Sequence, residues 1–268
     1  MNEHALNCIT SVAPSVAQIM GFDAPENAGE VNAALLQMAN IAFNGRKATR
    51  ALLYNPDAVA FHLYARYTDY FLPVLKNAPL ALPMQSVMPS VTPVCFASMY
   101  TGAMPEVHGI QAYVKPVLTC DTLFDAAIRF GIRVAIVSTT GDSISKIFLD
   151  RPMDYFIYDT VEEVNAKAAE LIAAKEHDIL VIYNGNYDST MHRFAPESPE
   201  ALEALRANTA QFDKFVSLVR KHWADEDTLV AFAPDHGCHP IDGGLGSHGL
   251  DMPEDMLITH FYGALPKE

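Results

Sequence analysis

Short apolar runs alternate with helical patterns through much of the chain, and this alternation limits the folds that the chain can adopt. Residues 133–138, 154–158 and 178–183 are apolar runs of strand length, and an alanine-rich helical pattern at 161–175 separates the last two. Such runs are typical of buried strands, and strands that alternate with helices pair mostly in parallel. The pattern therefore predicts an α/β fold with a mostly parallel sheet and helices on both of its faces.

Other segments extend this scheme. Residues 50–54 and 227–233 are further apolar runs of strand length, and 198–223 has the spacing of a long amphipathic helix. No linker rich in Gly, Pro or Ser divides the chain. We therefore expect one domain over residues 1–268, with a helical lead-in over 1–45.

Two more helices and one loop are predicted between these segments. Residues 121–130 have a helix pattern that closes on Gly131, and 58–72 have the pattern of an amphipathic helix that Pro73 ends or kinks. Residues 74–88 contain two more prolines, so we expect a loop with some extended backbone there.

Composition excludes several classes of protein. The chain has 268 residues, half of them hydrophobic, which is enough for a large core. Its formal net charge is −14 and it has no basic stripe, so a long nucleic acid is not an expected partner. The four cysteines lack CxxC spacing and are expected to be reduced. Signal-like and membrane-spanning patterns are missing, and we therefore expect a cytoplasmic protein without a membrane partner.

Acidic and histidine side chains gather near the end of the chain. Asp235 and His236 follow the apolar run 227–233. His248 comes after a glycine-rich stretch, and the flexible backbone of the glycines allows His248 to lie near Asp235 and His236. Residues at strand ends form the sites of open α/β sheets. Carboxylate oxygen and imidazole nitrogen are ligands for zinc and, less selectively, for manganese or iron. The alternative is a surface turn that happens to contain histidines.

Two more strand ends carry the same residue types. Asp188 and His192 follow the run 178–183, and their four-residue spacing places both on one face of a helical turn. Asp57 follows the run 50–54 in an Asn-Pro-Asp turn. A polar loop with an ordinary surface histidine is the alternative for the first pair, and an Asx turn or helix cap is the alternative for Asp57.

Thr92 is a candidate nucleophile. Pro93 suits the first turn of a helix, so Thr92 is expected at a helix N-terminus, where free amides and the helix dipole stabilise an anion or an alkoxide. A threonine hydroxyl is a weak nucleophile until its pKa falls, and metal coordination lowers that pKa. The alternative is that Thr92 only caps the helix.

The order and spacing of these residues resemble the alkaline phosphatase superfamily, and most closely its nucleotide pyrophosphatase/phosphodiesterase branch. The most specific match begins at Thr92, which stands nine residues before Thr101-Gly102 and is followed by Pro-Glu-Val-His-Gly-Ile at 105–110. The resemblance covers the catalytic frame from about residue 50 to the C-terminus. The further matches are D-S-x-x-H at 188–192, Asp-His-Gly at 235–237 and Ser-His-Gly at 247–249.

The resemblance implies an alkaline-phosphatase-like, three-layer α/β sandwich without a large cap domain. It also implies two divalent metal ions, either zinc or, as alternatives, manganese or iron. One ion would be held by Asp188, His192 and His248, and the other by Asp57, Asp235 and His236. Thr92 would touch the ion held by Asp57, Asp235 and His236 and act as the nucleophile.

The chain departs from the family pattern at several positions. Asp57 is followed by Ala58, where the family usually has glycine. Tyr113 stands where an asparagine usually holds a phosphate oxygen, and a phenol can donate the same hydrogen bond. Lys115 can add positive charge, and His239, without a family counterpart, is a further candidate substrate contact. A solvent-exposed lysine and a plain loop histidine are the alternatives for the last two.

These observations predict a metal-dependent hydrolase for a small phosphorylated or phosphonate substrate. Within that class we expect a phosphodiesterase that uses Thr92 and forms a phospho-threonine intermediate. The alternatives are a phosphomonoesterase, a phosphonate hydrolase similar to phosphonoacetate hydrolases, and a non-catalytic protein that binds metal or ligand. Sulfatase activity is disfavoured because threonine replaces the cysteine or serine nucleophile, and mutase activity because 268 residues leave little room for a cap.

Overall fold

The computed structural model describes residues 7–268. The strands are β1 (Asn7–Cys8), β2 (Arg50–Pro56), β3 (Leu80–Gln85), β4 (Val134–Thr139), β5 (Asp154–Tyr158), β6 (Ile179–Asn184), β7 (Thr228–Phe232), β8 (His239–Ile241), β9 (Leu245–Ser247) and β10 (Leu257–Leu265). Eight of them form one sheet in the order β1-β3-β10-β7-β2-β6-β4-β5, and β8 and β9 form a separate antiparallel hairpin.

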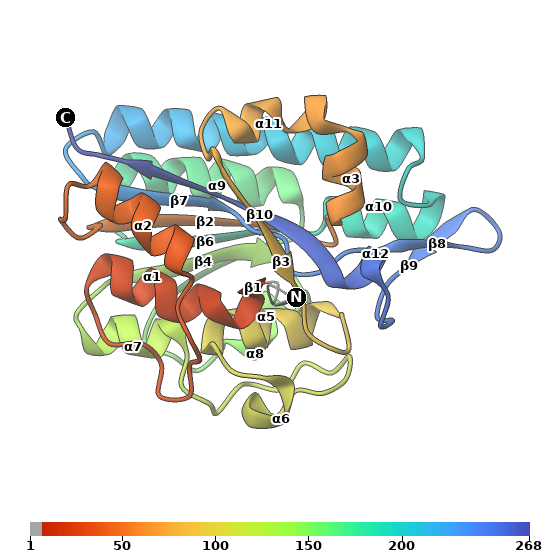
Figure 1. Cartoon of the computed structure of the whole chain (residues 1–268), viewed down its shortest axis with the longest axis horizontal. Helices are drawn as coiled ribbons and strands as arrows, with labels where there is room; N and C mark the ends of the chain where they lie inside the picture. Colours follow the sequence, from red (N-terminus) through yellow and green to blue (C-terminus); the bar gives the residue numbers. More distant parts are fainter. Residues whose placement is uncertain (1–6) are drawn as a thin grey trace, which may run out of the picture.

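Helices cover both faces of the large sheet. The helices are α1 (Val12–Met20), α2 (Ala33–Ala42), α3 (Phe61–Arg66), α4 (Leu72–Leu75), α5 (Thr92–Thr101), α6 (Pro105–His108), α7 (Leu123–Arg129), α8 (Ile144–Ile147), α9 (Val161–Ala174), α10 (Asn186–Phe194), α11 (Pro199–His222) and α12 (Pro253–Met256), with short 3-10 helices η1 (Ile9–Ser11) and η2 (Thr68–Phe71). Figure 1 shows α9 and α11 on one side of the sheet and α1, α5 and α7 on the other. The predicted three-layer α/β sandwich is therefore confirmed.

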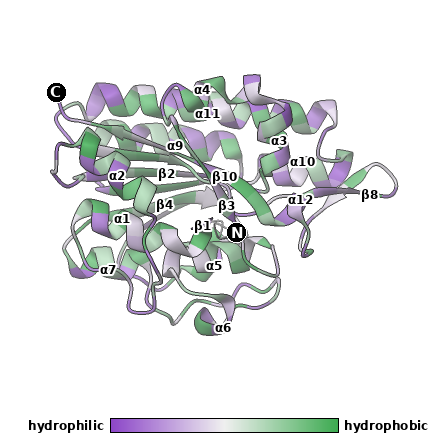
Figure 2. Ribbon diagram, in the orientation of Figure 1, coloured by the Kyte–Doolittle hydropathy of each residue, from purple (hydrophilic) through white to green (hydrophobic). Residues whose placement is uncertain are grey.

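The central strands bury both of their faces. On β2, Leu52 and Tyr54 pack toward α9 and α11, whereas Ala51 and Leu53 pack toward α1 and α5. Successive strand side chains point to opposite faces, so a strand between two helical layers has a continuous apolar sequence. Figure 2 shows this hydrophobic colouring along the central strands and more hydrophilic residues on the outer helices.

The parallel centre of the sheet positions the candidate site. β2 pairs in parallel with both β6 and β7, and β4 pairs in parallel with β5 and β6. The carboxyl ends of β2, β6 and β7 therefore meet at one edge, and the residues that follow them lie close together. The strands predicted at the five apolar runs and the helices predicted at 121–130, 161–175 and 198–223 are confirmed to within two residues.

The N-terminal segment contains two helices separated by a non-helical stretch, and it begins with the short strand β1. α1 and α2 lie within the predicted segment 1–45, and residues 1–6 of that segment lie outside the described residues. The four cysteines, all within the described range, are free. Among residues 7–268, no helix has the length and apolar character needed to cross a membrane.

The helix predicted at 58–72 is wrong as a single element. Tyr67 leaves the helical conformation (φ −117°, ψ 43°) and ends α3, after which η2 and α4 follow as separate short helices. Pro73 does not end a helix but lies in the first turn of α4, a position where its missing N–H has no intrahelical partner to lose.

Five strands were not predicted, namely the short β1, β8 and β9 and the longer β3 and β10. Residues 80–85 form β3 although Pro83 lies within them, because β1 pairs only with Met84 and Gln85 and leaves the Pro83 position unpaired on that side. β10 runs antiparallel to β3 and β7. Its apolar pattern is interrupted by Gly263, where a Cβ atom would lie only 2.1 Å from the Asn77 carbonyl oxygen.

Candidate metal centre

Three strand ends bring the predicted acidic and histidine side chains together. Asp57 directly follows β2, and Asp235 and His236 follow the neighbouring strand β7. Asp188 and His192 lie on α10, which begins after β6, on the other side of β2. His248 follows β9, so the hairpin returns it to this edge of the sheet.

The first group of three consists of Asp57, Asp235 and His236. One ligand atom from each lies within 4.8 Å of the others, and all three side chains are buried. His236 Nε2 is 3.4 Å from Asp57 Oδ1 and 3.3 Å from Asp235 Oδ2. His236 Nδ1–H donates to the Gly237 carbonyl (2.9 Å), which leaves the Nε2 lone pair directed at the carboxylates.

Ala58 links the ends of β2 and β7. Its backbone has a left-handed conformation (φ 61°), which favours glycine. In this conformation the Ala58 N–H donates to Asp235 Oδ1 at 3.2 Å. The chain therefore has the backbone geometry expected of an Asp-Gly pair although it carries Asp57 followed by alanine.

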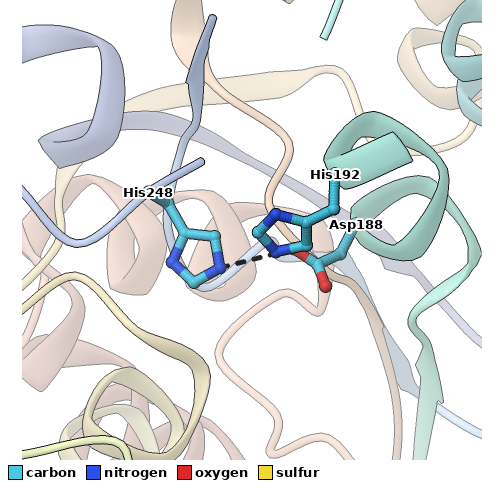
Figure 3. A group of neighbouring side chains, drawn as sticks. All are labelled: Asp188, His192 and His248. Carbon is cyan, nitrogen blue, oxygen red and sulfur yellow. Dashed lines mark ion pairs between the residues drawn. The ribbon is translucent and has the colours of Figure 1, made fainter. Parts of the chain in front are cut away.

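The second group of three consists of Asp188, His192 and His248 (Figure 3). Asp188 Oδ1 is 3.2 Å from His192 Nε2 and 3.5 Å from His248 Nε2. His192 Nδ1–H donates to the Gly246 carbonyl (2.9 Å), and His248 Nδ1–H donates to the Ser90 carbonyl (3.0 Å). Both rings thus present Nε2 to the carboxylate, as metal-binding histidines do.

The two groups are adjacent, and their donor atoms fit divalent cations. The rings of His236 and His248, one from each group, stack with their centroids 4.1 Å apart. Among the described residues, three buried carboxylate oxygens have no hydrogen-bond partner: Asp57 Oδ1, Asp188 Oδ1 and Asp235 Oδ2. Each group contains at least one of them, and unpaired buried carboxylate oxygens are rare unless a cation satisfies them.

Burial and mutual charge shift the pKa values of these groups. Burial, together with the charge of Asp188, raises the pKa of Asp57 to about 7. Burial and the nearby Asp57 raise the pKa of Asp235. Burial opposes charge on Asp188 too, but the adjacent imidazoles of His192 and His248 outweigh it and lower the Asp188 pKa. The metal-free site therefore resists carrying three full negative charges, which cations would compensate.

The histidines respond in opposite directions. The adjacent Asp188 carboxylate raises the pKa of His192 to about 9, against a smaller effect of burial. Burial lowers the pKa of His236 to about 3, which keeps its Nε2 free to bind a cation. The two groups thus differ in charge. The first group has two buried carboxyl groups and one imidazole, and the second has one carboxylate paired with two imidazoles.

Thr92 is the first residue of α5 and reaches the first group. Its side chain is buried, and its Oγ1 lies 3.3 Å from His236 Nε2 and 3.4 Å from Asp57 Oδ2. Val91, not Thr92, occupies the N-cap position, and Thr92 makes no capping hydrogen bond. The capping alternative is therefore wrong.

The three weaker predictions fall in different places. Tyr113 and Lys115 line the same cavity of about 400 Å³ as Thr92. Lys115 Nζ donates to the Gly141 carbonyl (2.8 Å), and the Tyr113 side chain is largely exposed. His239 does not line this cavity: its Nδ1–H donates to Asp255 Oδ1 (2.7 Å) in a buried position at the base of the hairpin.

One residue of the site was not identified from the sequence. Tyr183 is buried near the end of β6, lines the cavity and donates its hydroxyl hydrogen to Asp57 Oδ2. In the sequence it stands within an apolar strand, where a tyrosine is typical of the core. Only its position, five residues before Asp188 at a strand end, could have indicated a role.

The helix–sheet–helix layers, with acidic and histidine groups at the strand ends, define a member of the alkaline phosphatase superfamily. The chain matches the model of the type I phosphodiesterase / nucleotide pyrophosphatase family over residues 55–125 and 120–258. The chain therefore belongs to the type I phosphodiesterase / nucleotide pyrophosphatase family.

Two curated proteins match parts of the chain. Human ectonucleotide pyrophosphatase/phosphodiesterase family member 7 is 38% identical over 74 residues, which are 26% of this chain and 15% of that protein. GPI ethanolamine phosphate transferase 1 of Gibberella zeae is 29% identical over 108 residues, 38% of this chain and 11% of that protein. The chain thus spans only a small part of the length of these relatives.

Solved structures share the fold at low sequence identity. An inactive variant of murine ectonucleotide pyrophosphatase/phosphodiesterase 5, in complex with AMP, superimposes with a TM-score of 0.58 at 19% identity and covers 73% of this chain and 59% of that chain. Phosphonoacetate hydrolase from Sinorhizobium meliloti 1021, in complex with phosphonoformate, gives a TM-score of 0.54 at 20% identity over 74% of this chain and 59% of that chain.

Proposed function

We propose that this chain is a two-metal phosphoester hydrolase, and specifically a phosphodiesterase that uses Thr92 as its nucleophile. The observation that carries this proposal is the convergence of two groups of metal-ligand side chains, with unpaired carboxylate oxygens, next to the Thr92 hydroxyl. Membership of the type I phosphodiesterase / nucleotide pyrophosphatase family supports the same chemistry.

The two groups would each hold one divalent cation, zinc being favoured by the mixture of imidazole and carboxylate ligands. Such a pair of cations lowers the pKa of a bound hydroxyl and stabilises charge on the attacking and leaving oxygens of a phosphoryl transfer. The protein fixes the ligands: Gly246, Ser90 and Gly237 carbonyls hold the three imidazoles by their Nδ1–H groups.

Thr92 would act in two balanced steps. Its Oγ loses a proton to solvent and forms a bond to phosphorus, while the bond from phosphorus to the leaving alcohol breaks and the alcohol takes up a proton. Water then attacks the phospho-threonine, returns a proton to Thr92 Oγ and releases the phosphomonoester. α5 supports the first step because its free N-terminal amides favour negative charge near Thr92.

A diester is the better substrate class for this cavity. Lys115 is the only lysine or arginine among the described residues that line it, and its ammonium is engaged by the Gly141 carbonyl. A monoester dianion carries one more negative charge than a diester and would need further cationic partners. Phosphonate hydrolysis is the second candidate, since a structural neighbour with this fold binds phosphonoformate.

The test is metal content combined with hydrolysis. Purified protein loaded with zinc or manganese is expected to contain two metal ions per chain and to hydrolyse bis(p-nitrophenyl) phosphate faster than p-nitrophenyl phosphate or phosphonoacetate. Thr92→Ala is expected to lose at least about a thousandfold in kcat while still binding two metals, and Thr92→Ser to keep measurable activity. Full activity of Thr92→Ala would exclude the covalent mechanism.

A further inference from the structure

The cavity that contains Thr92 extends away from the metal ligands. It is also lined by the loops after β4 and β5 and by the start of α10, through Thr140, Ser143, Asp159 and Asn186. None of these residues belongs to either ligand group. This outer end of the cavity is therefore the place for a substituent carried by the phosphoryl group.

Two buried polar atoms at this end of the cavity have no hydrogen-bond partner among the described residues. Thr139 Oγ donates to Asp142 Oδ2 (3.0 Å), and Thr140 Oγ donates to Asp159 Oδ1 (2.9 Å), so these hydroxyls are satisfied by the protein. Ser143 Oγ and Asn186 Oδ1 are buried without a partner, and the Ser143 side chain is only 1% exposed. Buried polar atoms that line a cavity and lack a protein partner are suited to a ligand's hydrogen bonds.

The charge of this end is negative. Asp142 and Asp159 both line it, and the nearby Lys115 is held by the Gly141 carbonyl. A second phosphate or carboxylate on the substrate would meet these carboxylates and be repelled, whereas an ammonium group would be attracted.

Aromatic surface is sparse. Tyr113 and Tyr183 are the aromatic side chains among the described lining residues. Tyr183 is buried with its hydroxyl on Asp57, and Tyr113 is 60% exposed with the Lys115 ammonium 5.2 Å from its ring centroid. A nucleobase would find no second ring to enclose it, so the lining favours a short polar group over a nucleoside.

Resting on the proposed function, we propose that this outer end binds a short substituent that terminates in a hydroxyl or an ammonium group. Ser143 Oγ and Asn186 Oδ1 accept its hydrogen bonds, and Asp159 and Asp142 favour the ammonium form. The substrate class is thus a phosphodiester of a small amino alcohol or diol.

Three p-nitrophenyl diesters of equal size test this proposal, with propyl, 2-hydroxyethyl or 2-aminoethyl as the second substituent. They share one chromogenic leaving group and differ in a terminal methyl, hydroxyl or ammonium. We expect kcat/KM to rise in that order, by about tenfold or more in total. Equal values for the three, or a larger value for thymidine 5′-p-nitrophenyl phosphate than for the 2-aminoethyl ester, would overturn the inference.

Ser143→Ala tests whether this end of the cavity causes the preference for the hydroxyl and ammonium esters over the propyl ester. Because Ser143 Oγ makes no hydrogen bond to any of residues 7–268, the substitution removes no hydrogen bond within this part of the protein. We expect it to lower kcat/KM for the hydroxyl and ammonium esters about tenfold and to leave the propyl ester unchanged. Ser145→Ala is the matched control, since Ser145 Oγ donates to the Asp142 carbonyl (3.0 Å) in the same turn and does not line the cavity. An equal loss on all three esters would contradict the assignment.

Asp159→Asn separates charge from hydrogen bonding. The amide oxygen of the asparagine can still accept from Thr140 Oγ. We therefore expect kcat/KM to fall about fivefold for the 2-aminoethyl ester and to change little for the 2-hydroxyethyl ester. Failure to hydrolyse any diester, including bis(p-nitrophenyl) phosphate, would overturn the proposed function together with this inference. Turnover of bis(p-nitrophenyl) phosphate without a preference among the three esters would overturn this inference alone.

Discussion

Tyr183 holds Asp57 from the neighbouring strand. It lies on β6, which pairs in parallel with β2, and its hydroxyl donates to Asp57 Oδ2. With that oxygen occupied, Asp57 Oδ1, which has no hydrogen-bond partner within the described part of the chain, lies 3.4 Å from His236 Nε2. Hydrogen bonds that orient a metal-binding carboxylate strengthen metal binding without contacting the metal.

We therefore expect Tyr183→Phe to weaken zinc binding by about tenfold or more while the fold is retained. Competition with a chromophoric chelator measures the affinity, and circular dichroism monitors the fold. Tyr155→Phe is the control. Tyr155 lies on β5, and the substitution removes a hydroxyl that donates to the Phe148 carbonyl at 2.8 Å. Equal zinc affinities for the two variants would show that Tyr183 does not position Asp57.

His108 attaches α6 to α5 in its neutral form. Its Nδ1 accepts from the Ile110 N–H (3.2 Å), so the ring proton is on Nε2, which donates to Ser98 Oγ (2.9 Å). Burial lowers the His108 pKa to about 4, against about 6.5 in the unfolded chain. The unfolded chain thus binds more protons between these values, and the free energy of unfolding falls as pH falls from about 6.5 toward 4.

This difference predicts a pH-dependent effect of His108→Gln. From about pH 7 to about pH 5, the wild-type protein is expected to lose roughly 1 kcal/mol more unfolding free energy than the variant. Urea unfolding of metal-free protein at both pH values measures this. Parallel losses in the two proteins would mean that His108 is not held neutral.

At the scale of elements, the β8–β9 hairpin and α10 form one unit of the site. A Cβ atom at Gly246 would lie 2.6 Å from both the carbonyl oxygen and the Sδ of Met191 on α10. The Gly246 carbonyl also accepts from His192 Nδ1 (2.9 Å), and His248 follows the same strand. Glycine is therefore required for β9 to approach α10 closely enough to orient both histidines.

Gly246→Ala is expected to separate β9 from α10. We predict a loss of about 2 kcal/mol or more in unfolding free energy, and weaker binding of the metal held by Asp188, His192 and His248. Urea unfolding and metal titration measure the two effects. Gly29→Ala is the control, since its Cβ would have no neighbour closer than 3.7 Å. Similar behaviour of both variants would contradict the packing argument.

The elements also show what sequence could and could not predict. Asp235, His236, Asp188 and His192 were identifiable because each follows a continuous apolar run, which marks the end of a buried strand. β3 and β10 were not, because Pro83 and Gly263 interrupt their patterns and only pairing with distant strands makes those residues acceptable.

Individual contacts were beyond the reach of sequence for a different reason. The roles of the Tyr183 hydroxyl and the unpaired Ser143 oxygen depend on residues distant in the sequence, such as Asp57. Periodicity reports which face of an element is buried, but it does not report which polar atoms meet there.

For the whole molecule, two bound divalent cations would offset part of the formal net charge of −14, and we expect them to stabilise the fold. Each site that is saturated at about 100 times its dissociation constant contributes about 2.7 kcal/mol. For a chain of this size, loss of both ions is expected to lower Tm by about 10 °C. Calorimetry with and without a chelator measures the shift, and added zinc is expected to restore it. An unchanged Tm would argue against metal sites of useful affinity.

The sheet order has a consequence for how the protein is made. Asp57 is synthesised before its partners Asp235 and His236, which follow β7, and the second group is complete only when His248 has followed β9. A nascent chain would therefore lack a complete set of ligands for either ion until β7 or β9 has been translated, so we expect metal binding to follow assembly of the central strands rather than to begin it. A bound ion would therefore mark a molecule in which the ends of β2, β6 and β7 and the β8–β9 hairpin have already reached their native positions.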